Sequence, residues 1–141
     1  MPKIKTRTAS LFLLLTLLSA CLIPASARAS DYFKITDISI APQGGGQLKI
    51  VALVRATNQM DSVGVTSLEI KEKRADGKFY TVRTYTKKEV PSLMRYHAIA
   101  ASTEIFFRGT KGKVYQATAT CYAENATGSS SVIRHSLPVT A

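Results

Sequence analysis

Cysteine is scarce in this 141-residue chain, which has only two, and tryptophan is absent altogether. Cys21 lies in an N-terminal segment that we expect to be removed, so the remaining chain keeps Cys121 alone and forms no internal disulfide. Small exported domains often depend on disulfides for their stability. If this protein is exported, its domain must be stabilised by packing.

Long hydrophobic runs are also missing. The most apolar segment, Leu11–Ile23, is shorter than the roughly 20 apolar residues that a membrane-spanning helix needs. It follows three basic residues and precedes Ala27 and Ala29, which occupy the two small-residue positions of a cleavage site. This order is typical of a secretory signal peptide. We therefore predict a signal peptide over residues 1–29, cleavage before Ser30, and a secreted protein with no transmembrane helix in its mature chain.

An alternative processing site overlaps this segment. The sequence Leu18-Ser19-Ala20-Cys21 matches the pattern at which bacterial lipoproteins are cut and acylated on the cysteine. The residues after Cys21 are Leu22, Ile23 and Pro24, which are apolar where a polar tether is expected. We prefer ordinary cleavage at Ala29, and the alternative of a lipid anchor on Cys21 at the outer face of the membrane stays open.

Acidic residues are few, with nine Asp and Glu against 19 Lys and Arg. The predicted leader contains four of the basic residues and none of the acidic ones, so the mature chain has 15 basic residues and a formal charge of +6. This mature chain, residues 30–141, has the length of one domain. Its charge is moderately basic and predicts attraction to anionic partners outside the cell.

Helical periodicity is not found after Asp31. Short segments alternate between apolar and polar residues and are separated by turn signals such as Asn58–Asp61 and Asp76-Gly77. Between Lys87 and Ala98 the pattern is hardest to interpret, and Pro91 there opens either one helical turn or an irregular crossover. About seven strands are predicted, over 33–40, 47–57, 63–71, 79–85, 102–107, 114–124 and 130–137. This all-β pattern predicts a single antiparallel β-sandwich over residues 30–141.

The segment 114–124 has the strictest alternation. One of its faces has only one large residue and should point into the core; it consists of Tyr115, Ala117, Ala119, Cys121 and Ala123. Alanine fills little volume, so the opposing sheet must either approach closely or project large side chains into this space. We expect Phe33, Ile50 and Leu68 to supply them.

Several short motifs carry a resemblance to a known group of proteins. They are Met60–Leu68, Asp76-Gly77, Lys113–Tyr115 and Tyr122–Ser129. They resemble small exported bacterial proteins that form a domain-of-unknown-function family, most frequent in Gram-positive gut bacteria. The C-terminal part also resembles fibronectin type III modules, whose penultimate strand starts with a tyrosine and ends in an Asn-x-x-Gly turn. The resemblance, over Val63–Leu137, implies an immunoglobulin-like sandwich in the envelope or outside the cell, and it implies no catalytic residues.

Residues that could carry catalysis or bind a metal are too few and too far apart in the sequence. The only histidines are His97 and His135, and Cys121 should face the core, where thiols are usually inert. Zinc needs three or four ligands, usually with close spacing. No nucleophile-elbow, phosphate-loop or nucleic-acid-binding module is present. We predict a non-enzymatic protein with no catalytic residue, metal, cofactor or nucleic-acid partner.

Basic residues are the surface feature that points to a partner. Two groups, one on the central hairpin and one at the Gly109–Gly112 corner, include Lys71, Lys73, Arg74, Arg108, Lys111 and Lys113. These residues are the candidates for contact with an anionic surface such as a cell-envelope polymer. Lysines on edge strands also prevent sheets from aggregating, which is the simpler explanation for them.

Two classes of function remain open. The first is an exported module that binds the envelope or another extracellular target. The second is a structural or interaction subunit that associates through an edge strand, with itself or with another exported protein.

Overall fold

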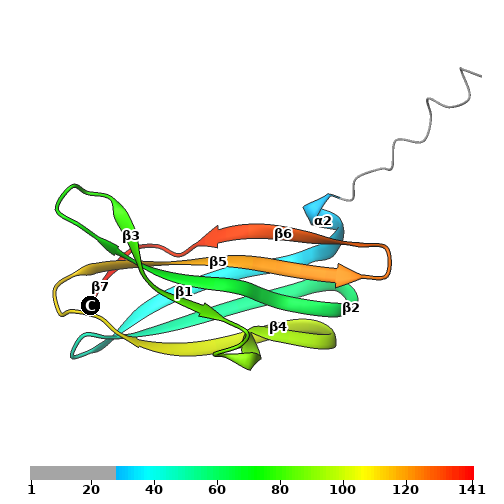
Figure 1. The fold of residues 1–141 in the computed structure, drawn as a ribbon, viewed down its shortest axis with the longest axis horizontal. Helices are drawn as coiled ribbons and strands as arrows, with labels where there is room; N and C mark the ends of the chain where they lie inside the picture. Colours follow the sequence, from blue (N-terminus) through cyan, green and yellow to red (C-terminus); the bar gives the residue numbers. More distant parts are fainter. Residues whose placement is uncertain (1–27) are drawn as a thin grey trace, which may run out of the picture.

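A computed structural model describes residues 28–141, and most of this part of the chain is strand (Figure 1). Every strand pair is antiparallel. The prediction of an all-β antiparallel fold is therefore confirmed. In chain order the elements are α2 (Ala29–Tyr32), β1 (Phe33–Gly44), β2 (Gln47–Lys73), β3 (Phe79–Thr86), η2 (Pro91–Leu93), β4 (Met94–Arg108), β5 (Val114–Asn125), β6 (Gly128–His135) and β7 (Val139–Thr140).

Strand β2 belongs to both layers of the sandwich. Its first half, up to Ala56, lies between β1 and β4. Its second half, from Ser62 onward, pairs with β5 along one edge. Along the other edge it pairs with the start of β4 up to Gly64, and with β3 from Ser67 onward. One layer is therefore β1–β2–β4 and the other is β6–β5–β2–β3, and the 27 residues of β2 run through both. This arrangement is the predicted β-sandwich.

The predicted turn at Asn58–Asp61 is wrong, because β2 continues through it. The pairing of β2 with β4 jumps from Arg55–Ala100 to Met60–Ala98, so β2 carries extra residues here. The side chain of Gln59 donates a hydrogen bond to the carbonyl of His97 at 3.0 Å. Polar turn residues thus mark an irregularity at which β2 exchanges β1 for β5 as its neighbour.

The number of strands matches the prediction, but their identity differs. Two predicted strands, 47–57 and 63–71, are one strand, and the short β7 completes the seven. Strand β4 starts at Met94 and not at Ser102, because the segment before Ser102 is extended and pairs with β2. Of the two alternatives left open at Pro91, the structure has the helical turn, a 3-10 turn over Pro91–Leu93.

The core contains the predicted face of β5. Tyr115, Ala117, Ala119, Cys121 and Ala123 are all buried. Ile50 and Leu68 of β2 are buried in the same cluster, and Phe33 packs against it while partly exposed. Ile50 and Phe33 come from the opposing layer, as predicted. Leu68 does not, because it pairs with Ala119 on the neighbouring strand of the same layer.

The chain joins the sandwich at Asp31 and Tyr32. The hydroxyl of Thr57 donates a hydrogen bond to the carbonyl of Asp31 at 2.8 Å, and Tyr32 is buried. Ala29 and Ser30, on either side of the predicted cleavage point, belong to the single helical turn α2. Ala27 and Cys21 lie outside the described residues. Within residues 28–141, no helix is long and apolar enough to cross a membrane.

Candidate binding surface at the basic end

Three connections meet at one end of the sandwich, on the left of Figure 1. They are the β1–β2 turn, the β2–β3 hairpin and the β4–β5 loop. Gln47 pairs with Arg108, and the amide of Gly109 donates to the carbonyl of Gly46 at 2.8 Å, which joins the first and third connections. Glu72 pairs with Tyr115, which brings the hairpin beside the same loop. Groups far apart in the sequence therefore share one end.

A buried tyrosine holds two of these connections together. The hydroxyl of Tyr115 accepts a hydrogen bond from the amide of Thr110 at 2.8 Å and donates one to Oε2 of Glu72 at 2.9 Å. Phe107 packs edge-on against its ring, with 5.7 Å between the ring centres. A Cβ atom on Gly109 would lie 2.7 Å from the Tyr115 ring, so this position needs glycine. The loop is thus fixed against the end of β2.

The predicted basic residues collect at this end, which we call the basic end. It consists of Lys71, Lys73, Arg74, Lys78, Arg108, Lys111 and Lys113. Three acidic residues accompany these seven, so the basic end has a formal charge of +4. Residues 30–141 as a whole have +6. Most of the excess positive charge is therefore located at one end of the molecule.

The three acidic residues of the basic end are engaged in internal contacts. Glu72 accepts the hydrogen bond from Tyr115, and Glu69 lies 3.4 Å from Nζ of Lys71. Asp76 accepts hydrogen bonds from the hydroxyl of Tyr80 at 2.6 Å and from the amide of Lys78 at 2.9 Å. These two bonds, the one from Tyr80 first, lower the pKa of Asp76 below its usual value. The hydrogen bond to Asp76 also raises the pKa of Tyr80.

The β2–β3 hairpin places one cation in a defined position. Its turn is closed by hydrogen bonds from the amide of Arg74 to the carbonyl of Lys78 and from the amide of Gly77 to the carbonyl of Arg74, both 2.9 Å long. The predicted Asp76-Gly77 turn is confirmed, and Gly77 has a φ of 80° that favours glycine. The Arg74 guanidinium lies 4.2 Å from the centre of the Tyr80 ring, a cation–π contact that orients it.

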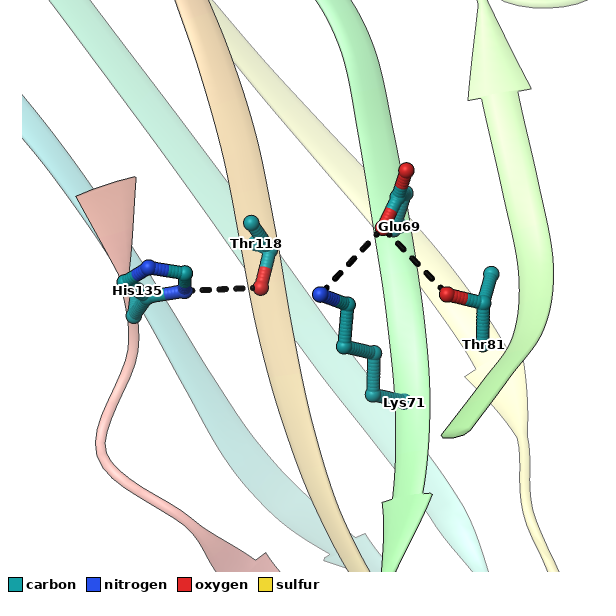
Figure 2. A network of polar contacts seen from close by, with 5 residues as sticks. All are labelled: Glu69, Lys71, Thr81, Thr118 and His135. Carbon is teal, nitrogen blue, oxygen red and sulfur yellow. Dashed lines mark hydrogen bonds and ion pairs between the residues drawn. The ribbon is translucent and has the colours of Figure 1, made fainter. Parts of the chain in front are cut away.

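One predicted contact residue, Lys71, differs from the other five. Figure 2 shows Lys71 on the outer face of β2, next to Glu69, which also accepts a hydrogen bond from the hydroxyl of Thr81 at 3.3 Å. On the same face, the hydroxyl of Thr118 and Nδ1 of His135 are 2.9 Å apart. Lys71 is partly buried and paired in the sheet, whereas the other five residues are exposed in or beside the connections, namely Lys73, Arg74, Arg108, Lys111 and Lys113.

The residues considered for catalysis are not brought together. Cys121 faces the core, while His135 is exposed beside the outward Thr118. Burial raises the pKa of the Cys121 thiol to about 11, which keeps it protonated and a weak nucleophile at neutral pH. His97 is exposed near the start of β4, beside residues 60–62 of β2. Among residues 28–141, no three His, Cys, Asp or Glu side chains are grouped so as to hold a metal ion.

Comparison with known proteins finds no family model and no curated protein that matches the chain. The contacts that organise the basic end could not be predicted from the sequence. The Tyr80 and Glu72 interactions depend on strand register, and the only sequence signal for them was the tyrosine at the start of a strand next to a glycine-containing corner. The candidate surface therefore depends on the geometry described above.

Proposed function

We propose that the protein is an exported, non-enzymatic β-sandwich module that binds an acidic polymer of the cell envelope through its basic end. The observation that carries this proposal is the convergence of cations from separate connections around Tyr115. The neighbouring carboxylates are already engaged by hydrogen bonds or ion pairs. Their three negative charges are already counted in the formal charge of +4, which remains for an external anion.

The distribution of the cations favours a polymer as the partner. Lys73, Arg74, Arg108, Lys111 and Lys113 are exposed and lie on or beside two different connections. Such a spread suits repeated phosphate or carboxylate groups along a chain, each making a weak and salt-sensitive contact. A single small anion would contact only a few of these side chains at once.

The position of the N-terminus favours a wall polymer over lipid head groups. α2 lies at the end opposite the basic end in Figure 1. Strand β1 connects the two ends with 12 residues, a length of about 40 Å at roughly 3.3 Å per residue. If Cys21 is lipidated, as in the alternative prediction, the basic end would point away from the bilayer. In that case the anion that it meets would be a polymer outside the membrane.

The resemblance to immunoglobulin-like modules gains support from the same tyrosine. In many such domains a tyrosine near the start of a late strand bonds back, through its hydroxyl, to the backbone a few residues upstream. Tyr115 starts β5 in this way, and its hydroxyl accepts from the amide five residues before it. This contact supports the proposal of an immunoglobulin- or fibronectin-like module.

Co-sedimentation with isolated Gram-positive cell walls tests the proposal. We expect binding at low ionic strength that is lost in about 0.5 M salt, where the screening length falls to a few ångströms. The triple variant Lys73→Glu, Lys111→Glu, Lys113→Glu should bind at least about tenfold more weakly. The control Lys34→Glu, Lys88→Glu, Arg95→Glu changes the net charge equally, away from the basic end, and should lose much less affinity.

Two results would contradict the proposal. One is an equal loss of wall binding in both triple variants, since the net charge and not the basic end would then be responsible. The other is tighter binding to phosphatidylglycerol vesicles than to walls, which would make lipid head groups the partner.

A further inference from the structure

Strand β2 changes its neighbour along one edge between Gly64 and Ser67. Up to Gly64 this edge pairs with the start of β4, and from Ser67 onward it pairs with the end of β3. On the opposite edge, the pairing with β5 shifts between Val65 and Ser67, so Thr66 is an extra residue in β2. The end of β3 and the start of β4 therefore meet beside Thr66.

An open groove of about 410 Å³ lies at this junction. It is lined by Thr66 of β2, by Thr86 at the end of β3, and by Lys87 and Lys88, which follow β3. Threonine methyl groups and the methylene stems of lysine make much of this lining apolar. The volume falls within the range of about 300–1,000 Å³ that is typical of sites for small molecules. The groove is therefore large enough to hold part of a small organic ligand.

Two tyrosines and a carboxylate lie beside the groove on the outer face of the sheet. Ser62 is paired with Tyr96 of β4 on one side and with Glu124 of β5 on the other, so these three residues form one row. In the next row, Tyr122 is paired with Gly64, which has no side chain to fill the space beside the ring. The hydroxyls of Tyr122 and Ser62 donate hydrogen bonds to Oε2 of Glu124, at 2.9 and 3.2 Å. Both bonds end on Oε2, so Oε1 is the oxygen that can accept from a ligand.

Lys87 connects the groove with the two tyrosines. Its Nζ lies 3.4 Å from the hydroxyl of Tyr96 and 6.0 Å from the centre of the Tyr96 ring. The hydrogen bond to Glu124 raises the pKa of Tyr122, and the positive charge of Lys87 nearby opposes this rise. Tyr96 keeps 59% of its surface exposed. The groove thus has an exposed aromatic ring, an ammonium donor and a carboxylate acceptor beside it.

We propose that this groove binds a neutral oligosaccharide that contains N-acetylhexosamine. The exposed ring of Tyr96 offers a rigid apolar surface to the apolar face of a sugar ring. The ammonium of Lys87 donates to a carbonyl or hydroxyl oxygen, and the carboxylate of Glu124 accepts from an amide or a hydroxyl. An acetamido group supplies both partners at once. Its methyl group suits the apolar lining of the groove.

The charges at the groove favour an uncharged ligand over an acidic polymer. Lys87, Lys88 and Glu124 together have a formal charge of +1, against +4 at the basic end. The carboxylate of Glu124 would also repel a phosphate or carboxylate group held by Lys87. Aromatic contact and hydrogen bonds would therefore determine the affinity, which should change little with salt.

This inference goes beyond the binding of an acidic polymer, because it concerns a second site with a different ligand. We expect a Kd of about 1 mM for the groove, which is too weak to hold the protein on sedimented walls by itself. The two proposals fail separately. A soluble oligosaccharide reports on the groove at any ionic strength, whereas the basic end binds walls only at low ionic strength.

NMR titration of the isotope-labelled protein with chitotetraose, a neutral N-acetylglucosamine oligosaccharide, tests the site. We expect the amide signals of Thr66, Lys87 and Tyr96 to shift, with the same Kd at low ionic strength and in about 0.5 M salt. Cellotetraose lacks the acetamido groups and should bind at least about threefold more weakly. The proposal would be overturned by the absence of shifts at about 10 mM chitotetraose, by shifts confined to the basic end, or by equal binding of the two sugars.

Substitutions of exposed residues test the individual contacts. Tyr96→Ala should raise the Kd for chitotetraose at least about tenfold, because it removes the aromatic surface. The matched control Tyr80→Ala removes a tyrosine at the basic end and should leave the Kd unchanged. Lys87→Met keeps an apolar stem but removes the donor, so the Kd should rise at least about threefold, whereas Lys34→Met on β1 should have no effect. Equal effects in either matched pair of folded variants would overturn the proposal.

Discussion

The hydroxyl of Tyr115 lies 2.9 Å from Oε2 of Glu72 and donates a hydrogen bond to it. Glu72 stands near the end of β2 and Tyr115 at the start of β5, 43 residues later. The same hydroxyl accepts the amide hydrogen of Thr110, so one buried oxygen connects the β2–β3 hairpin with the β4–β5 loop. The cations of the basic end are held on these two connections. Their arrangement therefore depends on a side chain that carries no charge.

Removing this hydroxyl should destabilise the protein. In Tyr115→Phe the amide of Thr110 loses its partner in a partly buried position, at a cost of about 1–3 kcal/mol in the free energy of unfolding. Urea unfolding measures the loss. The matched control Tyr122→Phe removes a hydroxyl bonded to Glu124 on the exposed face and should cost less than about 0.5 kcal/mol. Equal losses in the two variants would show that Tyr115 does not organise this end.

Gly64 should tolerate no side chain. It lies in β2 between β4 and β5, and a Cβ atom there would be 2.1 Å from the carbonyl oxygen of Leu93 and 2.9 Å from Cα of Met94. Gly64→Ala should therefore cost more than about 4 kcal/mol, or prevent folding. The control Gly77→Ala lies in a turn with φ of 80° and open space around it, and should cost about 1–2 kcal/mol. A stable, folded Gly64→Ala protein would contradict this geometry.

The local pattern of β5 could be predicted from the sequence because its alternation is strict. Residues two apart on a strand share a face, so the row of small residues had to be inside once the strand itself was recognised. The buried positions of Ala117, Ala119 and Cys121 follow from this rule alone. The Asp76-Gly77 hairpin was predictable for a similar reason, since its turn needs glycine at a left-handed position.

The continuity of β2 could not be predicted from the sequence. Asn58 and Asp61 have the composition of a turn, but a wide irregularity inside a strand uses the same polar residues. Whether these residues form a turn or an irregularity inside a strand depends on which strands lie beside β2 at that point. Long-range pairing decides which strands these are. The basic end was missed as a unit for the same reason. Lys73 and Lys113 come together only through the register of β2 with β5.

Overpacking of the core should test the face assignment of β5. Ala119 is fully buried and paired with Leu68. Ala119→Phe adds a ring where no space exists and should cost at least about 1–3 kcal/mol, seen as a lower melting temperature. The control Thr120→Phe introduces the same ring on the outward face, where it can lie over the sheet. It should melt within a few degrees of the original protein. No loss in Ala119→Phe would contradict the assignment.

The Cys121 thiol should make stability depend on alkaline pH. Burial raises its pKa from 9.0 to about 11, so between these values the unfolded chain releases a proton that the folded protein retains. The unfolded state therefore gains free energy, and stability should fall by up to about 1.4 kcal/mol per pH unit through this window. Below pH 9 this contribution is constant. Denaturation of the original protein and of Cys121→Ala at several pH values isolates the effect, because other groups titrate equally in both. A parallel decline in the two proteins would mean that the thiol ionises as easily in the fold as outside it.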